Sequence, residues 1–221
     1  IIIIDPDNDC EISIEGSAFG TSGTITTNGL SPFTIEIRPV NDRIVEGSLH
    51  TCSVSYDFST STSSQYSGLT RSPDIYNIND NDTATYQFAV SSDSVTEGTG
   101  VGTTTVNVAV TTSFNTGGGS IPPVGSDALE TAIQVPYTIG GASTATGGGT
   151  DYTITASPIT IPTSGATQNI VVNVNRDSIT EANETLILNL GVESGGSSGQ
   201  QAAVTQGGTT PHTLTINDDD Q

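Results

Sequence analysis

The chain has 221 residues and a formal net charge of −20, which comes from 24 acidic and 4 basic side chains. This charge argues against nucleic acid and anionic membrane surfaces as partners, because both would repel it. The sequence has no Met, no Trp, no Lys and few aromatic residues, so Val, Ile, Leu and Thr must build its cores, which favours thin β-sandwiches.

Apolar residues alternate with polar ones at a period of two wherever they cluster, which predicts an all-β chain without a convincing amphipathic helix. The expected strands lie at 1–4, 11–15, 24–26, 33–38, 49–56, 75–78, 85–90, 101–112, 132–139, 158–161, 168–174, 185–190 and 213–216. Pro39 is expected to end one strand, and Pro136 places another at a sheet edge or a bulge, since proline cannot donate to a ladder. Gly-rich, Pro-rich and Ser-rich segments at 114–130, 140–149 and 191–210 are expected to be loops.

An internal repeat divides the chain. The acidic loop Val40–Gly47 aligns with Val174–Ala182 if one inserted residue is allowed. Each loop follows a predicted strand and precedes another, and each half of the chain ends in an Asp-rich strand terminus. The sequence therefore predicts two tandem Ig-like antiparallel β-sandwiches, an incomplete one over residues 1–82 and a complete one with insertions over residues 83–221.

Clusters of carboxylates stand at the ends of predicted strands. Asp218, Asp219 and Asp220 follow the last strand, and Asp80 and Asp82 follow the strand at 75–78. Two such charges 4 Å apart repel by roughly 4 kcal/mol at an effective dielectric of about 20. A repeated arrangement of this kind indicates a bound cation, and hard oxygen ligands without nearby Cys or His indicate calcium. The alternative is a solvated acidic surface of a soluble or halophilic protein.

Several features bear on the compartment. Cys10 and Cys52 both fall on predicted strands, so they form either a disulfide in an oxidising compartment or two buried thiols. Asn81 and Asn183 begin N-glycosylation sequons, which matter only in a secretory host, and the stretch 59–64 would accept O-glycans. The first residue is not Met, so we expect a removed leader or a piece of a longer protein. No stretch is long enough to span a bilayer.

No catalytic arrangement stands out, and we expect the protein not to be an enzyme. His50 and His212 lie beside predicted strands and are expected to be structural. There is no G-x-S-x-G elbow, and the Gly runs at 117–119 and 147–149 do not follow the strand-to-helix pattern of a phosphate loop. The paired carboxylates sit side by side at strand ends, which suits metal binding better than glycoside cleavage.

Four motifs within residues 83–220, in order, resemble those of the Calx-beta repeat of sodium–calcium exchangers, integrin β4 and large extracellular adhesins. They are Val95-Thr96-Glu97-Gly98, Gly149-Thr150-Asp151-Tyr152, Asp177 through Glu184, and Ile216-Asn217-Asp218-Asp219-Asp220. The first expected unit, residues 1–82, matches only from about residue 33 to residue 82.

The resemblance implies a seven-stranded Ig-like sandwich that binds calcium at one end through loop carboxylates. The ligands it implies in the second unit are Glu97, Asp151, Asp177, Glu181, Asp218, Asp219 and Asp220. Only Asp42, Glu46, Asp80 and Asp82 are implied in the first unit, where the opening Glu and the Asp-Tyr pair are missing. A cation at Asp80 and Asp82 would stiffen the joint between the units, and the alternative there is a flexible acidic linker.

The first unit lacks counterparts of the strands at 85–90 and 101–112. An incomplete sandwich leaves an apolar groove and unpaired backbone groups, which an upstream segment or a strand of a neighbouring subunit would fill. Ile1–Ile4 is the expected donor strand. Head-to-tail contacts of this kind propagate as a fibre. We therefore expect an extracellular structural subunit that forms a fibre or stalk, and the alternative is a fragment of a large calcium-dependent cell-surface adhesin.

Overall fold

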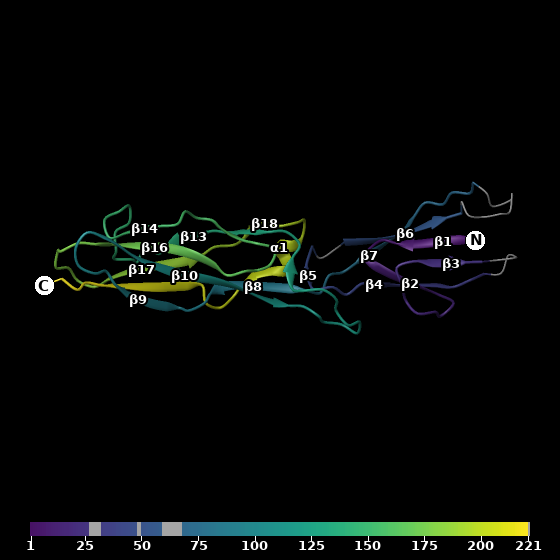
Figure 1. Ribbon diagram of the computed structural model, residues 1–221, viewed down its shortest axis with the longest axis horizontal. Helices are drawn as coiled ribbons and strands as arrows, with labels where there is room; N and C mark the ends of the chain where they lie inside the picture. The colour runs from purple at the N-terminus through teal and green to yellow at the C-terminus, as the bar shows by residue number, and fades with distance from the viewer. Residues whose placement is uncertain (27–31, 48–49, 59–67, 221) are drawn as a thin grey trace. The chain divides into compact units, whose positions relative to one another are not determined.

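The structure is a computed structural model that describes residues 1–26, 32–47, 50–58 and 68–220 (Figure 1). Nearly all regular structure in these ranges is β-strand, and the helix α1 (Gln200–Ala203) is a single short turn. The expected all-β fold is therefore confirmed. Within the same ranges no helix has the length and apolar character needed to cross a membrane. The expected O-glycan stretch at 59–64 lies outside the described residues.

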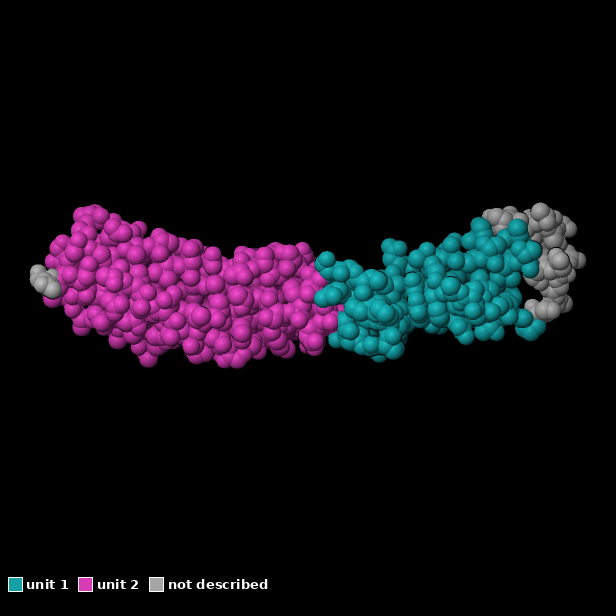
Figure 2. Space-filling model, turned by 60° about the horizontal axis from the view of Figure 1, so that its bottom comes forward, with its two compact units in different colours: residues 1–43, 48–81, 117–126 teal, residues 44–47, 82–116, 127–221 magenta. Residues whose placement is uncertain are grey.

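The chain forms two compact units, which Figure 2 colours separately. Unit 1 comprises residues 1–43, 48–81 and 117–126, and unit 2 comprises residues 44–47, 82–116 and 127–221. The chain crosses from the main part of unit 1 to the main part of unit 2 between residues 81 and 82, beside the boundary expected at residue 82. Each unit also includes one short segment from the part of the chain that mainly builds the other unit. In unit 1, the side-chain amide of Asn41 holds the 117–126 segment by donating to the carbonyl oxygens of Gly118 and Ile121, at 3.0 and 2.5 Å.

Unit 1 has a four-stranded sheet in the order β3-β1-β6-β7 and a two-stranded sheet of β2 and β4. Its strands are β1 (Ile2–Pro6), β2 (Cys10–Ile14), β3 (Gly23–Ile25), β4 (Ile35–Pro39), β6 (His50–Asp57) and β7 (Asp74–Ile78). The strand expected to be donated, Ile1–Ile4, is instead paired within its own unit, because β1 pairs with β3 on one side and β6 on the other, and Ile4 is fully buried.

A small core holds the two sheets of unit 1 together. Ile4, Ile12, Ile25 and Val54 are its buried aliphatic residues, and the buried Cys10 and Cys52 belong to the same cluster. The two cysteines form a disulfide between β2 and β6, with their Cα atoms 5.8 Å apart. The apolar residues that alternate along these strands thus lie on the faces where the two sheets pack together, and the disulfide links the two sheets covalently.

Unit 2 is a larger sandwich. A five-stranded sheet has the order β14-β16-β10-β8-β19, and a four-stranded sheet has the order β13-β17-β20-β9. The strands of these sheets are β8 (Thr83–Phe88), β9 (Ser92–Thr96), β10 (Gly102–Asn115), β13 (Tyr137–Ile139), β14 (Tyr152–Ile154), β16 (Gln168–Arg176), β17 (Glu184–Leu190), β19 (Val204–Gln206) and β20 (Pro211–Asn217). Alternate residues of both sheets, such as Val172 of β16 and Leu188 of β17, are buried in one core.

Short strands complete unit 2. They are β5 (Ile44–Val45), β11 (Ala128–Leu129), β12 (Ile133–Val135), β15 (Ile159–Ile161) and β18 (Ser194–Gly195). The single strand expected at 132–139 is divided at Pro136, since β12 and β13 belong to different sheets. The proline cannot donate a backbone hydrogen bond, and it marks the point where the chain changes sheet.

The expected loop at 191–210 contains β18, α1 and β19 instead. A buried polar side chain anchors this segment, which hydropathy does not reveal. Gln200 is fully buried, its Nε2 donates to the Thr131 carbonyl oxygen at 2.9 Å, and its Oε1 accepts from the Thr131 hydroxyl at 2.8 Å and the Ser197 amide at 2.9 Å. Burying an amide with its hydrogen bonds satisfied avoids the desolvation penalty of unpaired polar groups.

Candidate metal centre

Five strand ends meet at one end of unit 2. Thr96, the last residue of β9, pairs with Asn217, the last residue of β20, and the first residue of β17, Glu184, pairs with Ile216. In the other sheet, the first residue of β14 pairs with β16 two residues before β16 ends. The acidic loops that leave these strands therefore come together at one edge of the sandwich.

Six carboxylates form two close groups of three at this edge. Glu97, Asp177 and Asp220 each offer an oxygen, and these oxygens all lie within 4.8 Å of one another. Asp151, Glu181 and Glu184 form a second group that meets the same condition. We call them the first and second triads. Three like charges this close repel one another strongly unless protons or a cation neutralise them.

The first triad is the more buried. Glu97 is only 7% exposed, and its Oε1 and the Oδ2 of Asp220 are buried without a hydrogen-bond partner among the described residues. Burial raises the pKa of Glu97 to about 7, and the charges of Asp177, Asp218 and Asp220 add to the shift. Buried carboxylate oxygens that no donor satisfies are costly, and a hard cation is the group that suits them. The residues of the first triad therefore fit calcium.

Backbone hydrogen bonds hold the loops around the first triad. Asp177 Oδ1 accepts from the amide of Ile179 at 2.7 Å. Asp218 accepts from the amides of Glu181 and Asp220, at 2.9 and 3.1 Å, and Asp219 accepts from the amide of Gly98 at 2.9 Å. Asp218 and Asp219 lie outside the two triads, where they tie the loops to one another. Their implied role as ligands stays a prediction.

The second triad joins the loop before β14 to the loop before β17. Asp151 Oδ2 accepts from the amide of Thr146 at 2.5 Å, which fixes that carboxylate. Burial raises the pKa of Glu184 to about 7, and a hydrogen bond with Asp151 and its charge contribute further. Burial and then the charge of Asp151 also raise the pKa of Glu181. Glu184 was missing from the expected ligands, although it fills the last position of the Asp177–Glu184 motif, which is the signal that identifies it.

The acidic residues implied for a first-unit site are not grouped in this way. Asp42 and Asp80 belong to unit 1, and Glu46 and Asp82 belong to unit 2. None of the four belongs to a close group of metal-ligating side chains in the described ranges, so a site there stays a prediction. Asp7 lies close to Cys10 and Cys52, but disulfide sulfurs are not thiolate ligands.

The remaining candidate residues lie as follows. Asn81 and Asn183 are both exposed, and the Asn183 side chain donates to the Asn217 side chain at 3.1 Å and accepts from the Asp218 amide at 3.2 Å. His212 is buried, its Nδ1 lies 2.9 Å from the Val90 carbonyl oxygen, and its ring packs beside Phe88. These contacts are those of a structural histidine.

The raised pKa values predict that unit 2 without calcium is more stable in weak acid. Each pKa lies at about 7 in the folded state against an ordinary 4.5, so the folded state holds protons that the unfolded state releases. The stability that comes from these bound protons is fully present below pH 4.5 and is lost as the pH rises toward about 7. With a chelator present, we expect thermal unfolding followed by circular dichroism to give a lower Tm at pH 8 than at pH 5. Glu97→Gln should flatten the dependence of Tm on pH. A Tm at pH 8 that equals or exceeds the Tm at pH 5 would contradict the prediction.

Among solved structures, the apo-form Calx CBD1 domain is 22% identical, with 62% of this chain and 99% of that chain covered and a TM-score of 0.44. The Calx CBD2 domain is 14% identical, with 62% and 87% covered and a TM-score of 0.45. The calcium binding domain CBD12 of CALX1.1 is 12% identical, with 96% and 86% covered and a TM-score of 0.41.

A search of curated proteins gives no significant match. A family model described as the Calx-beta domain matches residues 123–220, the part of the chain that carries all of both triads except Glu97.

Proposed function

We propose that the protein is an extracellular structural subunit in which calcium braces unit 2 and strand complementation joins copies head-to-tail into a fibre or stalk. The observation that carries the calcium role is the first triad, with its two buried carboxylate oxygens that no donor satisfies. The match of residues 123–220 to the Calx-beta family model supports the same role.

Calcium would be held by the carboxylates of the two triads. When bound, it supplies the positive charge that these groups lack. Glu97, Asp177 and Asp220 come from loops that follow β9, β16 and β20, so one ion there joins segments of both sheets. Asp151, Glu181 and Glu184 join the entrances of β14 and β17 in the same way. The binding free energy of an ion that the unfolded chain does not bind becomes stability of the fold.

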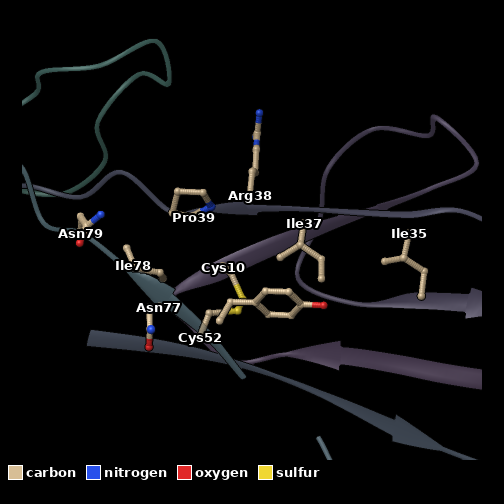
Figure 3. Close-up of a pocket in the computed structure, with 10 residues that line it drawn as sticks. Cys10, Ile35, Ile37, Arg38, Pro39, Cys52, Asn77, Ile78 and Asn79 are labelled. Atoms are coloured by element: carbon tan, nitrogen blue, oxygen red, sulfur yellow. A yellow bond between two sulfur atoms is a disulfide. The ribbon is translucent and has the colours of Figure 1, made fainter. Parts of the chain in front are cut away.

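The joining of copies rests on a groove in unit 1, between the edge strands β4 and β7. The groove has a volume of about 580 Å³, and its lining includes Ile35, Ile37, Ile78 and the Cys10–Cys52 disulfide (Figure 3). An apolar groove between two strand edges is the kind of site that an added strand fills. The groove differs from any surface that would enter it, so the contact is heterologous, and a heterologous contact builds an open fibre when its rotation does not close a ring.

Placement outside the cell is part of the proposal. The disulfide supports it, because such bonds persist in oxidising surroundings. Calcium concentrations there are also suited to the weaker sites of extracellular modules, which bind at roughly 0.1–1 mM. The second candidate, a fragment of a large calcium-dependent adhesin, is favoured by the same groove, since a preceding segment of a longer chain would fill it equally well.

Electron microscopy of the protein in millimolar calcium tests the proposal. We expect regular fibres, which shorten or disperse when a chelator removes calcium. Dispersed single molecules at every calcium concentration would overturn the fibre and favour the adhesin fragment. Isothermal calorimetry on the same sample measures calcium binding separately, and a failure to bind calcium would overturn the brace.

A further inference from the structure

We propose that Thr104 is a positioning residue of the candidate metal centre, because its hydroxyl fixes the backbone of Glu97 before an ion binds. The inference rests on the proposed calcium role of the first triad, and it adds a residue that offers no carboxylate to the ion. It follows from the hydrogen bonds of the loop at 97–101, which joins β9 to β10 and carries Glu97.

The loop at 97–101 has little to hold its shape by itself. Two of its five residues are glycines, and both have positive φ angles, +88° at Gly98 and +85° at Gly100. Glycine adopts this region at little cost, but it also loses more conformational freedom than any other residue when a loop becomes ordered. The carboxylate of Glu97 therefore has a fixed position only if contacts from outside the loop hold its backbone.

The hydroxyl of Thr104 makes such a contact. Thr104 lies on β10, and its Oγ1 donates to the Glu97 carbonyl oxygen at 2.6 Å. The Nε of Arg176, the last residue of β16, donates to the same Oγ1 at 2.9 Å. A guanidinium can only donate, so the Thr104 hydroxyl accepts from Arg176 and its own proton is directed to Glu97. The side chain of Arg176 thus fixes the direction in which Thr104 donates.

Three amide hydrogen bonds also hold the loop, and all their acceptors lie at or beyond the ends of β16 and β20. These bonds run from Glu97 to the Asn217 carbonyl oxygen at 3.1 Å, from Gly98 to Asp219 Oδ1 at 2.9 Å and from Gly100 to the Asp177 carbonyl oxygen at 2.9 Å. Thr104 differs from these acceptors because it lies within the ladder of β10 and β16, where it pairs with Val174. The sheet therefore holds Thr104 in place independently of the acidic loops.

This contact matters most when no ion is bound. The carboxylates of Glu97, Asp177 and Asp220 then repel one another, and the repulsion favours a loop conformation that moves Glu97 away from the other two. The hydrogen bond from Thr104 opposes that movement by holding the Glu97 backbone. An ion then meets a ligand that is already in place, so less of its binding free energy is offset by ordering the loop.

A matched pair of threonine variants tests the role. Thr104→Val keeps the shape of the side chain and removes the hydroxyl. Thr105→Val makes the same change at the next residue of β10, whose hydroxyl donates to the Asn173 side chain at 2.8 Å and not to the loop. We expect Thr104→Val to weaken calcium binding at the first triad about five- to tenfold, the effect of one lost hydrogen bond, and Thr105→Val to leave it unchanged.

Isothermal calorimetry measures the affinity, and Glu97→Gln identifies the first triad as the site whose binding that variant removes. Thr104→Ser keeps the hydroxyl and should restore most of the lost affinity. The inference is wrong if Thr104→Val binds calcium like the unmodified protein, if both valine variants weaken binding equally, or if Thr104→Ser restores nothing.

Amide hydrogen exchange in a chelator gives a second readout that needs no bound calcium. In Thr104→Val the amides of residues 98–100 should exchange faster than in the unmodified protein, while those of β17 and β20 should not change. Faster exchange throughout unit 2 would show a general loss of stability and would overturn the positioning role. If the unmodified protein binds no calcium, the proposed calcium role fails and the inference fails with it, whereas calcium binding with unchanged loop exchange in Thr104→Val overturns the inference alone.

Discussion

Saturating calcium is expected to raise the free energy of unfolding of unit 2 by roughly 5 kcal/mol, since each of two ions at about 100 times its dissociation constant adds about 2.7 kcal/mol. The corresponding rise in Tm is about 10–20 °C for a unit of this size. The physical reason is that each triad concentrates three carboxylates that only a cation or protons neutralise. Differential scanning calorimetry in calcium and in a chelator measures the difference, and equal transitions would contradict it.

Single variants separate the two triads. Glu97→Gln should remove about half of the calcium-dependent stabilisation, because it deletes one charge of the first triad and leaves the second intact. Asp93→Asn is a matched control, since Asp93 is an exposed acidic residue of β9 that lies outside both triads. If the control and Glu97→Gln lose calcium stabilisation equally, general charge screening and not site binding explains the effect.

Reducing the Cys10–Cys52 disulfide is expected to destabilise unit 1 by about 4 kcal/mol. The estimate follows from the entropy of closing a loop across the 42-residue separation of the two cysteines. The core of unit 1 has few buried residues, and small cores seldom provide more than about 3–5 kcal/mol. Reduced unit 1 should therefore be largely unfolded at room temperature.

Limited proteolysis with and without reductant measures this effect. We expect cleavage within unit 1 to accelerate strongly after reduction and cleavage within unit 2 to stay unchanged, because both cysteines lie in unit 1. The double variant Cys10→Ala with Cys52→Ala serves as a control for side reactions of the reductant. Equal resistance of the reduced and oxidised proteins would contradict the prediction.

Long alternating segments made much of the fold predictable. The strand expected at 168–174 is β16, and the strand expected at 185–190 is β17, with differences of only one or two residues at their ends. Both place buried aliphatic residues at every second position, which is the pattern that the burial of one strand face imposes.

Strands at exposed edges were not predictable in the same way. β9 was not among the expected strands. Four of its five residues are exposed, so no buried face leaves a trace in its sequence. Its pairing with β20 supplies the order that its own composition does not show. Tertiary contacts determine whether such segments form strands, and the local pattern of apolar and polar residues does not.

The candidate site followed the motifs but not each of their residues. The resemblance brought together Glu97, Asp151, Asp177, Glu181 and Asp220, and these lie in the two triads. The run of three aspartates at 218–220 has only its last member in a triad, because consecutive side chains point in different directions and two of them bond to backbone amides. Sequence order alone does not distinguish such roles.

The exchange of short segments between the units determines how the chain can be divided. Val45 lies in the half of the chain that mainly builds unit 1, yet it is fully buried in the core of unit 2, where β5 pairs with β11. Residues 117–126 are likewise part of unit 1, although they follow β10 of unit 2 in the chain. A cut at residue 82 would therefore remove a core residue from one product and a packed loop from the other. Any future dissection, permutation or fusion of this protein has to treat its two sandwiches as interleaved and keep them on one polypeptide.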